Sequence, residues 1–492
     1  MINERENGYL TVGLAERSSI AETSMDVSLP DYQSEIRRVL NVTATPLPPA
    51  KYVGADTVEF NGTVDYQVLY VGGDGELYSI PLSGEYSFSV PYERGECENE
   101  DVSVLCSICT ESASARVSAP RRLSVRARLR PTVRIYGKRS TQTAMLSEVD
   151  PMSVYKNEQS CACVCCESVV SDAIELNAVV PLASDDVRVV SADTRICVES
   201  CERGENVLKC RGKARLRLLC AGEEEYSVAT ESIPFEGCIE LPIDVSDGFC
   251  RVRGVVCETS VSVSERSAQC GIGILLEASV GKTRQAVYTS DVYSTKNECE
   301  CRADEVLTRR LIACESSGLT LSERVPLAST GIPEDAQIVD TLCTVCFDRC
   351  DAVDSRPTFG GNAEFCVVYK KDDEVYASTV RVPMKYAATS LSDSAPVSFD
   401  CYCEAVDVFA RVEKGELRLG AELLISAECM GESEVCFIES ARFAEPLERR
   451  ESEMIVCYPV PDDTLWSVAK RYKVAPSDVV GDPTEDKYVI IE

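Results

Sequence analysis

Apolar and polar residues alternate along much of the chain, which is the pattern of β-strands buried on one face. In the segment 63–71, Val64, Tyr66 and Val68 fall on the same face, because successive side chains of a strand point to opposite sides. The segment 123–129 is apolar at every second position and carries arginines in between. Turn sequences rich in Gly and Asp separate such segments. The pattern predicts many short strands with regular turns and a mainly β fold of sandwich or barrel type.

The strand pattern occurs three times. Three segments align through Gly62, Gly212 and Gly361, which are 150 and 149 positions apart, and each ends in a bulky apolar run. A second landmark, the sequence VPLAS, begins at position 180 and again at position 325. A period of this length is that of a domain and not of a solenoid repeat. We therefore expect three tandem β-sandwich-like domains, called the first, second and third copies below, at residues 1–140, 141–284 and 285–445.

The final stretch, residues 450–492, follows a different pattern. A strand-like start at 455–460 is followed by apolar residues at helical spacing, namely Leu465, Val468, Ala469 and Tyr472. A second, short helix is expected near Pro476, since Pro is favoured in the first turn of a helix. A strand-like segment closes the chain at 488–491. The order predicts a small βααβ module after the three domains.

The start of the expected first helix resembles a known signature. The sequence DTLWSVAKRY, from Asp463 to Tyr472, resembles that of LysM modules. Such modules bind glycans that contain N-acetylglucosamine, through the loop before the first helix and the loop before the last strand. The resemblance implies a binding site for a partner or glycan that is formed by Asp463, Thr464, Leu465, Trp466 and Tyr488.

Both loops depart from the LysM pattern. Asp462 stands where the signature has Gly, and the stretch 481–487 is short, acidic and without the usual Gly-Gln. These departures favour docking to a protein over binding to a glycan. For Trp466, the one Trp of the chain, two interpretations stay open: packing at the module surface, or contact with a partner.

The three copies resemble the SPOCS domain in their Leu-Pro start, their glycine-bearing strand and the DVYST element at 291–295. SPOCS domains followed by a C-terminal LysM module resemble the SipL-type spore-coat morphogenetic family of endospore-forming anaerobes. The resemblance implies a scaffold that tethers the coat to the forespore surface, first in the mother-cell cytoplasm and then in the spore coat. Its implied partners are the family's coat-basement ATPase, another coat protein or further copies of itself. A cell-wall protein that binds peptidoglycan is the alternative.

Candidate chemistry is sparse. The chain has no His, which excludes Ser-His and Cys-His catalysis and His metal ligands. The Gly-Ile-Gly at 271–273 lacks the Lys-Ser/Thr of a phosphate-binding loop. Carboxylates are too numerous for any pair to stand out as an acid and base. We expect no enzyme activity and no cofactor.

Cysteine is abundant, with 27 residues. The first ten residues, MINERENGYL, lack the apolar region of an export signal, so we expect a reducing cytosol and free, packed thiols. The CxxC pairs at 106–109 and 343–346 lack the glycine-bearing turn of a zinc knuckle, so no metal is predicted, although a thiolate metal protein is a competing hypothesis. The CxC pair at 299–301 has polar flanks and suggests oxidative crosslinking as a further hypothesis.

The formal net charge of −31 argues against nucleic acid and anionic membrane surfaces as partners, because both are negatively charged. No segment approaches the roughly 18 apolar residues of a membrane span. With 45% apolar residues, each expected domain can bury a core. The sequence thus predicts a non-enzymatic assembly protein without nucleic-acid binding or membrane insertion.

Overall fold

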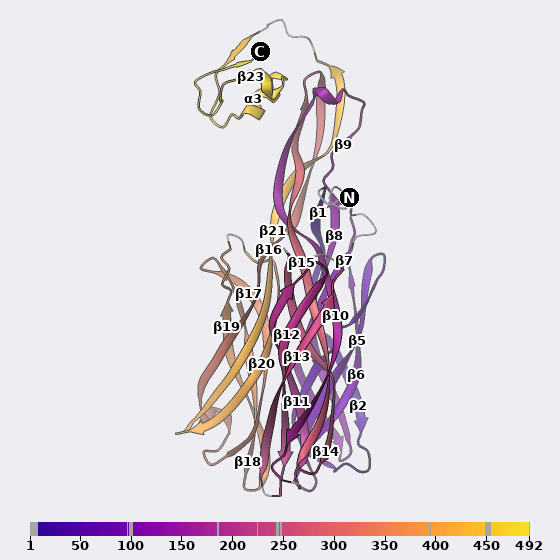
Figure 1. The fold of residues 1–492 in the computed structure, drawn as a ribbon, viewed down its shortest axis with the longest axis vertical. Helices are drawn as coiled ribbons and strands as arrows, with labels where there is room; N and C mark the ends of the chain where they lie inside the picture. Colours follow the sequence, from indigo (N-terminus) through magenta and orange to yellow (C-terminus); the bar gives the residue numbers. More distant parts are fainter. Residues whose placement is uncertain are drawn as a thin grey trace.

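The computed structural model describes residues 8–491 apart from 96, 98–101, 185, 224, 243–245, 247, 393–394 and 448–453. The described chain is mainly β, as predicted, and its strands form several separate sheets. The molecule is elongated (Figure 1). Three groups of strands lie side by side in the lower part, longer strands continue upward as a narrow stalk, and the C-terminal residues lie at the far end of this stalk.

The first copy contains two alternating segments that face each other in its core. Its strands are β1 (Tyr9–Ser18), β2 (Ala21–Ser28), β3 (Ile36–Pro46), β4 (Ala50–Val53), β5 (Thr57–Gly72), β6 (Leu77–Pro91), β7 (Ser103–Ala119) and β8 (Arg122–Ser140). Strand β5 pairs with β3, β4 and β6, whereas β8 pairs with β1, β2 and β7. Val64, Tyr66 and Val68 of β5 pack with Leu123 and Val125 of β8. The faces predicted from the alternation are therefore the buried faces.

The second and third copies have the same order of strands and cores of their own. The second copy contains β10 (Val154–Pro181), β11 (Arg188–Arg203), β12 (Val207–Ala221), β13 (Tyr226–Glu240), β14 (Phe249–Ser264) and β15 (Ser267–Ser294). The third contains β16 (Asn297–Pro326), α2 (Leu327–Thr330), β17 (Gln337–Val353), β18 (Arg356–Lys371), β19 (Glu374–Ala387), β20 (Ser398–Glu413) and β21 (Glu416–Pro446). Leu216 and Phe365 occupy the positions that correspond to Tyr66, and all three are buried. The repeated sequence pattern thus marks equivalent core positions.

Strand pairing also connects the copies. Strand β1 pairs antiparallel with β16, with Val12 opposite Thr308, so that strands of the first and third copies share one sheet. The short strand β9 (Ala144–Met145) pairs with β21 and precedes a 3-10 turn, η1 (Pro151–Ser153). The boundary expected between residues 284 and 285 lies inside β15, which runs on to Ser294.

The three copies are arranged as a ring, in which β3 contacts β19, β11 contacts β6 and β17 contacts β13. At the first of these interfaces, Arg38 lies 4.3 Å from the ring centre of Tyr376. At the second, Arg188 lies 4.6 Å from the ring centre of Tyr78. Arg38 and Arg188 hold corresponding positions of two copies, so one cation-π contact is used twice around the ring. The centre of the ring is closed by an apolar cluster to which all copies contribute, including Leu69, Leu219 and Val368.

The interface between the second and third copies is crossed by a set of ion pairs that all have the same polarity. Every arginine comes from the second copy and every carboxylate from the third, in the pairs Arg195–Glu404, Arg215–Asp407, Arg217–Asp340 and Arg251–Asp400. The third copy carries Gln337 at the position of Arg38 and Arg188. This interface therefore lacks the repeated arginine and is held by charge complementarity between the two copies.

A buried ionic cluster lies where all three copies meet. Arg134 of the first copy binds Glu428 of the third at 2.6 Å, with side-chain exposures of 4% and 0%. The neighbouring pair joins Arg251 of the second copy to Asp400 of the third. Each arginine also interacts electrostatically with the other carboxylate. The two ion pairs thus lie together, one fully buried and one largely shielded from solvent.

The landmark glycines of the repeat are explained by the backbone. A Cβ atom on Gly212 would overlap the carbonyl oxygen of Cys197, and one on Gly361 would overlap that of Cys346. Both glycines lie opposite irregularities in the neighbouring strand, where an extra residue brings the two backbones together. On Gly62 the Cβ would instead meet the hydroxyl end of Tyr86. Close packing of strand backbones therefore requires glycine in the second and third copies, and packing of the Tyr86 side chain favours it in the first.

The expected βααβ order is not evident at the C-terminus. The described elements are β22 (Ile455–Cys457), α3 (Leu465–Tyr472), η2 (Pro476–Asp478), β23 (Val479–Val480) and β24 (Val489–Ile491). The segment expected as a second α-helix forms only the 3-10 turn η2. Lys473 ends α3 in the left-handed conformation and the chain is extended again at Val479, which leaves too few residues for an α-helix. The three strands form a small sheet in the order β22-β24-β23.

Candidate functional site

The C-terminal module, defined here as residues 454–491, contains the predicted binding residues. Thr464 caps α3. Its hydroxyl accepts a hydrogen bond from the Ser467 amide at 3.2 Å, and the Ser467 hydroxyl accepts one from the Thr464 amide at 2.9 Å. The side chain of Asp463 is buried, accepts from the Val460 amide at 2.9 Å and binds Arg471. These bonds with Arg471 and Val460 hold the pKa of the Asp463 carboxyl below its ordinary value. Asp463 and Thr464 thus build the loop before α3, with Asp463 buried in it and Thr464 exposed.

Trp466 docks the module onto the stalk. Its indole N–H donates to Asp291 of β15 at 2.8 Å, and Lys470 binds the other oxygen of the same carboxylate at 2.6 Å. The indole also meets Tyr293 edge-on, with ring centres 5.0 Å apart. The Tyr293 hydroxyl donates to the carbonyl of Val474 at 2.7 Å, which adds a bond just after the C-terminal end of α3. Of the two interpretations left open for Trp466, packing is the one that its contacts support, although the packing surface belongs to another part of the chain.

Two tyrosines form an exposed pair on the module. Tyr458 follows β22 and Tyr488 precedes β24, with side chains 66% and 51% exposed and ring centres 6.3 Å apart. Val460 and Leu465, in the loop before α3 and at its first residue, are also exposed. The pair lies on the two loops that the sequence resemblance pointed to. Its flat, amphipathic rings can stack on an apolar face of a sugar or receive apolar side chains of a protein.

The acidic loop beside this pair is internally bonded. The carboxylate of Asp482 accepts from the Thr484 amide at 2.8 Å, and that of Asp486 accepts from the Asp482 amide at 2.7 Å. Gly481 has φ +109°, which a residue with a side chain adopts only with strain. The loop is thus held in a defined turn by its own hydrogen bonds, and Tyr488 lies at its end.

Of the five residues predicted for the site, the structure exposes Thr464, Leu465 and Tyr488 on the module surface, where they lie outside the stalk contacts described above. Asp463 and Thr464 are engaged within the module, and Trp466 is engaged with the stalk. Sequence reasoning missed Tyr458, because the apolar run at 455–460 was assigned to one strand. The strand ends at Cys457, and Tyr458 lies in the loop that follows.

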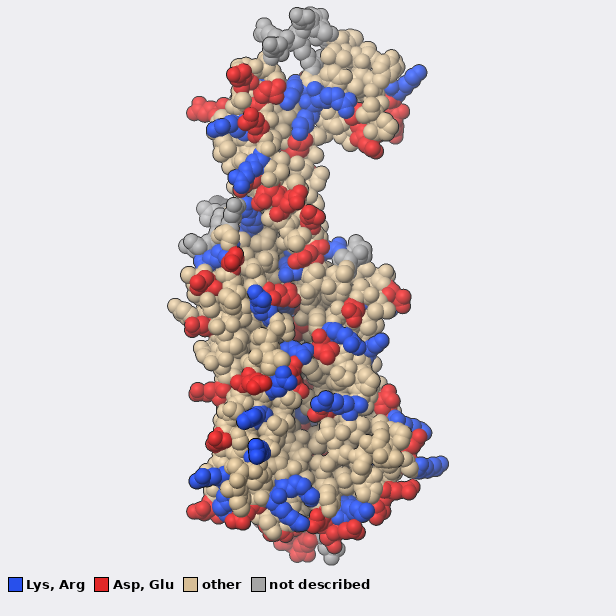
Figure 2. Space-filling view, turned by 180° about the vertical axis from the view of Figure 1, so that it is seen from behind, with Lys and Arg blue, Asp and Glu red and all other residues tan. Residues whose placement is uncertain are grey.

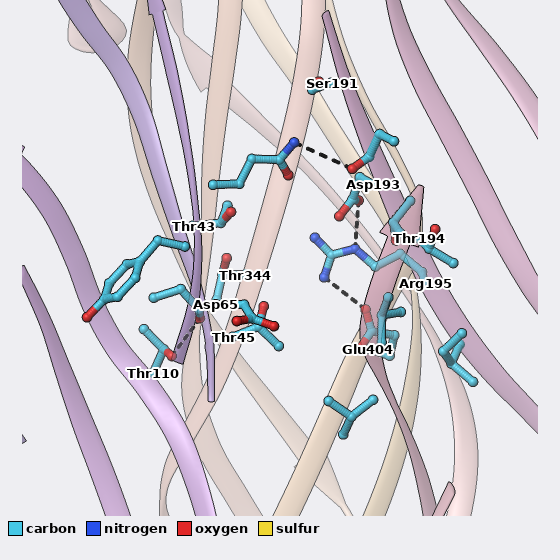
Figure 3. Close-up of a pocket in the computed structure, with 18 of the residues that line it drawn as sticks. Thr43, Thr45, Asp65, Thr110, Ser191, Asp193, Thr194, Arg195, Thr344 and Glu404 are labelled. Carbon is cyan, nitrogen blue, oxygen red and sulfur yellow. Dashed lines mark hydrogen bonds and ion pairs between the residues drawn. The ribbon is translucent and has the colours of Figure 1, made fainter. Parts of the chain in front are cut away.

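A second candidate is a cavity of about 1030 Å³ near the axis of the ring, lined by all three copies. Figure 3 shows Arg195 of β11 held between Asp193 and Glu404. Its guanidinium binds these carboxylates at 2.8 and 2.9 Å. Threonines of the first and third copies, Thr43, Thr45 and Thr344, lie across from it. Arg195 is thus satisfied by two carboxylates, and the cavity lining offers hydroxyls together with the thiols of Cys109 and Cys346.

The cysteine motifs do not converge on a metal site. In the part of the chain that the structure describes, no group of three or more His, Cys, Asp and Glu side chains is placed to hold a metal ion. The CxxC pairs lie within strands β7 and β17, where residues three apart point to opposite faces. Cys163 and Cys165 are buried, whereas Cys301 is exposed. The CxxC cysteines and the CxC pair at 299–301 are all free thiols.

The charged surface is mixed in sign. On the face drawn in Figure 2, basic and acidic side chains are interspersed along the length of the molecule. Among the described helices, none is long and apolar enough to cross a membrane. Compared with protein-family models, curated proteins and solved structures, the chain has no significant match.

Proposed function

We propose that the protein is a non-enzymatic scaffold of the spore coat, which tethers the coat to the forespore surface. The proposal rests on the resemblance of the chain to SPOCS domains followed by a LysM-like module, as in the SipL-type family. In this proposal the copies are three tandem β-sandwich-like domains. The protein acts in the mother-cell cytoplasm and then in the coat, with the coat-basement ATPase, another coat protein or its own copies as partners.

The observation that carries a docking role is the exposed pair of Tyr458 and Tyr488. Exposed aromatic side chains are enriched where proteins bind one another, because they bury much area with little loss of side-chain freedom. The pair is carried at the end of the stalk, far from the bulk of the strands (Figure 1). Asp291 and Tyr293 anchor α3 to the stalk, so the module can present this pair in a defined direction. A rigid arm with an exposed tip suits a tether.

Localisation of the full chain in sporulating cells tests the proposal. A fluorescent fusion of the wild type is expected to encircle the forespore, and the double variant Tyr458→Ser/Tyr488→Ser is expected to stay dispersed. The matched control is Tyr32→Ser/Tyr52→Ser, which removes two exposed tyrosines of the first copy and should leave encirclement intact. Failure of the wild type to encircle the forespore would remove the proposal. If Tyr458→Ser/Tyr488→Ser still encircles the forespore, the tyrosine pair is not the docking surface.

Peptidoglycan binding is the second candidate function, favoured by the same pair because tyrosine rings stack on sugar rings. Against it stand the acidic loop next to Tyr488 and the internal use of Asp463 and Thr464, which leave few donors for an acetamido group. Sedimentation of the full chain with purified peptidoglycan separates the two. Saturable binding that is lost in Tyr458→Ser/Tyr488→Ser and kept in Tyr32→Ser/Tyr52→Ser would establish the glycan function in place of protein docking.

A further inference from the structure

Two cysteines from different copies face each other at the axial cavity. Cys109 lies on β7 of the first copy and Cys346 on β17 of the third, and their Sγ atoms are 3.6 Å apart. Both side chains are half-buried and both line the cavity of about 1030 Å³. A small solute that enters the cavity therefore reaches both sulfurs. The two residues are 237 positions apart in the chain, so only the ring arrangement brings them together.

The distance is close to that of a bond. A disulfide has an S–S length of about 2.0 Å, so each sulfur has to move by less than about 1 Å to reach it. Other close pairs differ in what they connect. Cys201 and Cys210 are 3.6 Å apart but are opposite each other in one hairpin, and Cys299 and Cys301, 3.5 Å apart, lie on one strand. A bond between Cys109 and Cys346 would join two copies.

A cation lies beside the thiol pair. Arg130 is directly across from Cys109 in the β7–β8 pair, where it also binds Glu111 at 2.7 Å. The charge of Arg130 acts to lower the pKa of both thiols, against the opposing effect of burial. The thiolate is the reactive form, so the sulfur that ionises attacks and the other sulfur of the pair resolves.

We propose that Cys109 and Cys346 are a peroxide-sensitive thiol pair whose oxidation links the first and third copies covalently. In the first step one sulfur of the pair attacks hydrogen peroxide, the O–O bond breaks, and a sulfenic acid and one water form. In the second step the other sulfur attacks the sulfenic sulfur, the S–O bond breaks, and the S–S bond and a second water form. Two thiols are oxidised and one peroxide is reduced, with both thiol protons ending in water. This inference stands independently of a role in the spore coat.

Peptide mapping of the full-length protein tests it. The reduced protein is treated with one to a few equivalents of hydrogen peroxide, alkylated and digested with trypsin. The expected product joins the peptides 95–116 and 325–349, and tandem mass spectrometry must place the link at Cys109 and Cys346 and not at Cys97, Cys106 or Cys343. On a denaturing gel without reductant, the long covalent loop should make the oxidised protein run faster. Dithiothreitol should reverse the shift.

Variants separate the pair from other thiols. Cys346→Ser should abolish both the linked peptide and the gel shift, whereas Cys301→Ser, at an exposed site, should keep them. In Cys109→Ser the sulfenic acid of Cys346 has no resolving thiol and should be trapped by dimedone. Wild-type protein that forms other disulfides but never the Cys109–Cys346 link would overturn the proposal, and so would a gel shift that persists in Cys346→Ser. Because the wild-type map decides the matter by itself, a variant that fails to fold does not rescue the proposal.

Discussion

Loss of Arg134 should destabilise the ring, because it leaves a buried carboxylate without its partner. The Arg134–Glu428 contact is 2.6 Å long, and its side chains are 4% and 0% exposed. Removing one member of such a buried pair costs about 3–5 kcal/mol, since the remaining charge keeps its desolvation penalty. We therefore expect Arg134→Met to lower the free energy of unfolding by about that amount.

An exposed pair of the same geometry is the control. Arg381 and Glu364 are also 2.6 Å apart, but their side chains are 70% and 42% exposed. Water already solvates both groups, so Arg381→Met should cost no more than about 1 kcal/mol. The double variant Arg134→Met/Glu428→Met removes both buried charges and should recover most of the loss, because apolar groups of similar size need no ionic partner.

Urea unfolding of the full chain at pH 7, followed by far-ultraviolet circular dichroism, measures these differences. Fluorescence of Trp466 provides a second probe that reports on the C-terminal module, and the two transitions need not coincide in a chain with several cores. Equal losses in Arg134→Met and Arg381→Met would refute the reasoning. A double variant less stable than Arg134→Met would refute it as well, because burial of unpaired charge could then not be the cause.

Three further results are expected. Burial alone would raise the pKa of the Asp400 carboxyl, but Arg251 outweighs burial and holds the pKa below the ordinary value of 3.8. This stabilisation is complete above about pH 5 and declines at lower pH, so Asp400→Asn should flatten the fall of unfolding free energy between about pH 5 and 3, and an unchanged slope would contradict this. Asp291→Ala removes the acceptor of the Trp466 indole and should shift its emission to longer wavelength with unchanged circular dichroism; an unshifted emission would mean that the module stays docked. Gly361→Ala should lower the free energy of unfolding in urea by about 1–3 kcal/mol, because the added Cβ overlaps the Cys346 carbonyl oxygen. Gly318→Ala, at a position with open space around it, should be nearly neutral, and equal effects of the two substitutions would count against the backbone explanation.

The two loops of the candidate site were located by sequence, but the role of each side chain was not. The capping bonds between Thr464 and Ser467 are local, because the two residues are three positions apart in the chain. The partner of Trp466 is Asp291, which lies 175 positions earlier in the chain. No pattern within a single strand or helix reports such a contact, so packing and partner binding could not be separated from the sequence.

Local periodicity determined the strands, and the 150-residue recurrence of Gly62 in Gly212 and Gly361 determined that the chain contains three related units. The strands and the repeat follow from interactions within a strand or between neighbouring strands, and such interactions leave a local pattern in the sequence. The shape of the assembly was decided by the tertiary structure. The pairing of Val12 with Thr308, the approach of Cys109 to Cys346 and the contact of Arg134 with Glu428 each join residues more than 230 positions apart. Such contacts depend on how the surfaces of the folded copies fit together. That fit is a property of the whole fold and not of any one segment.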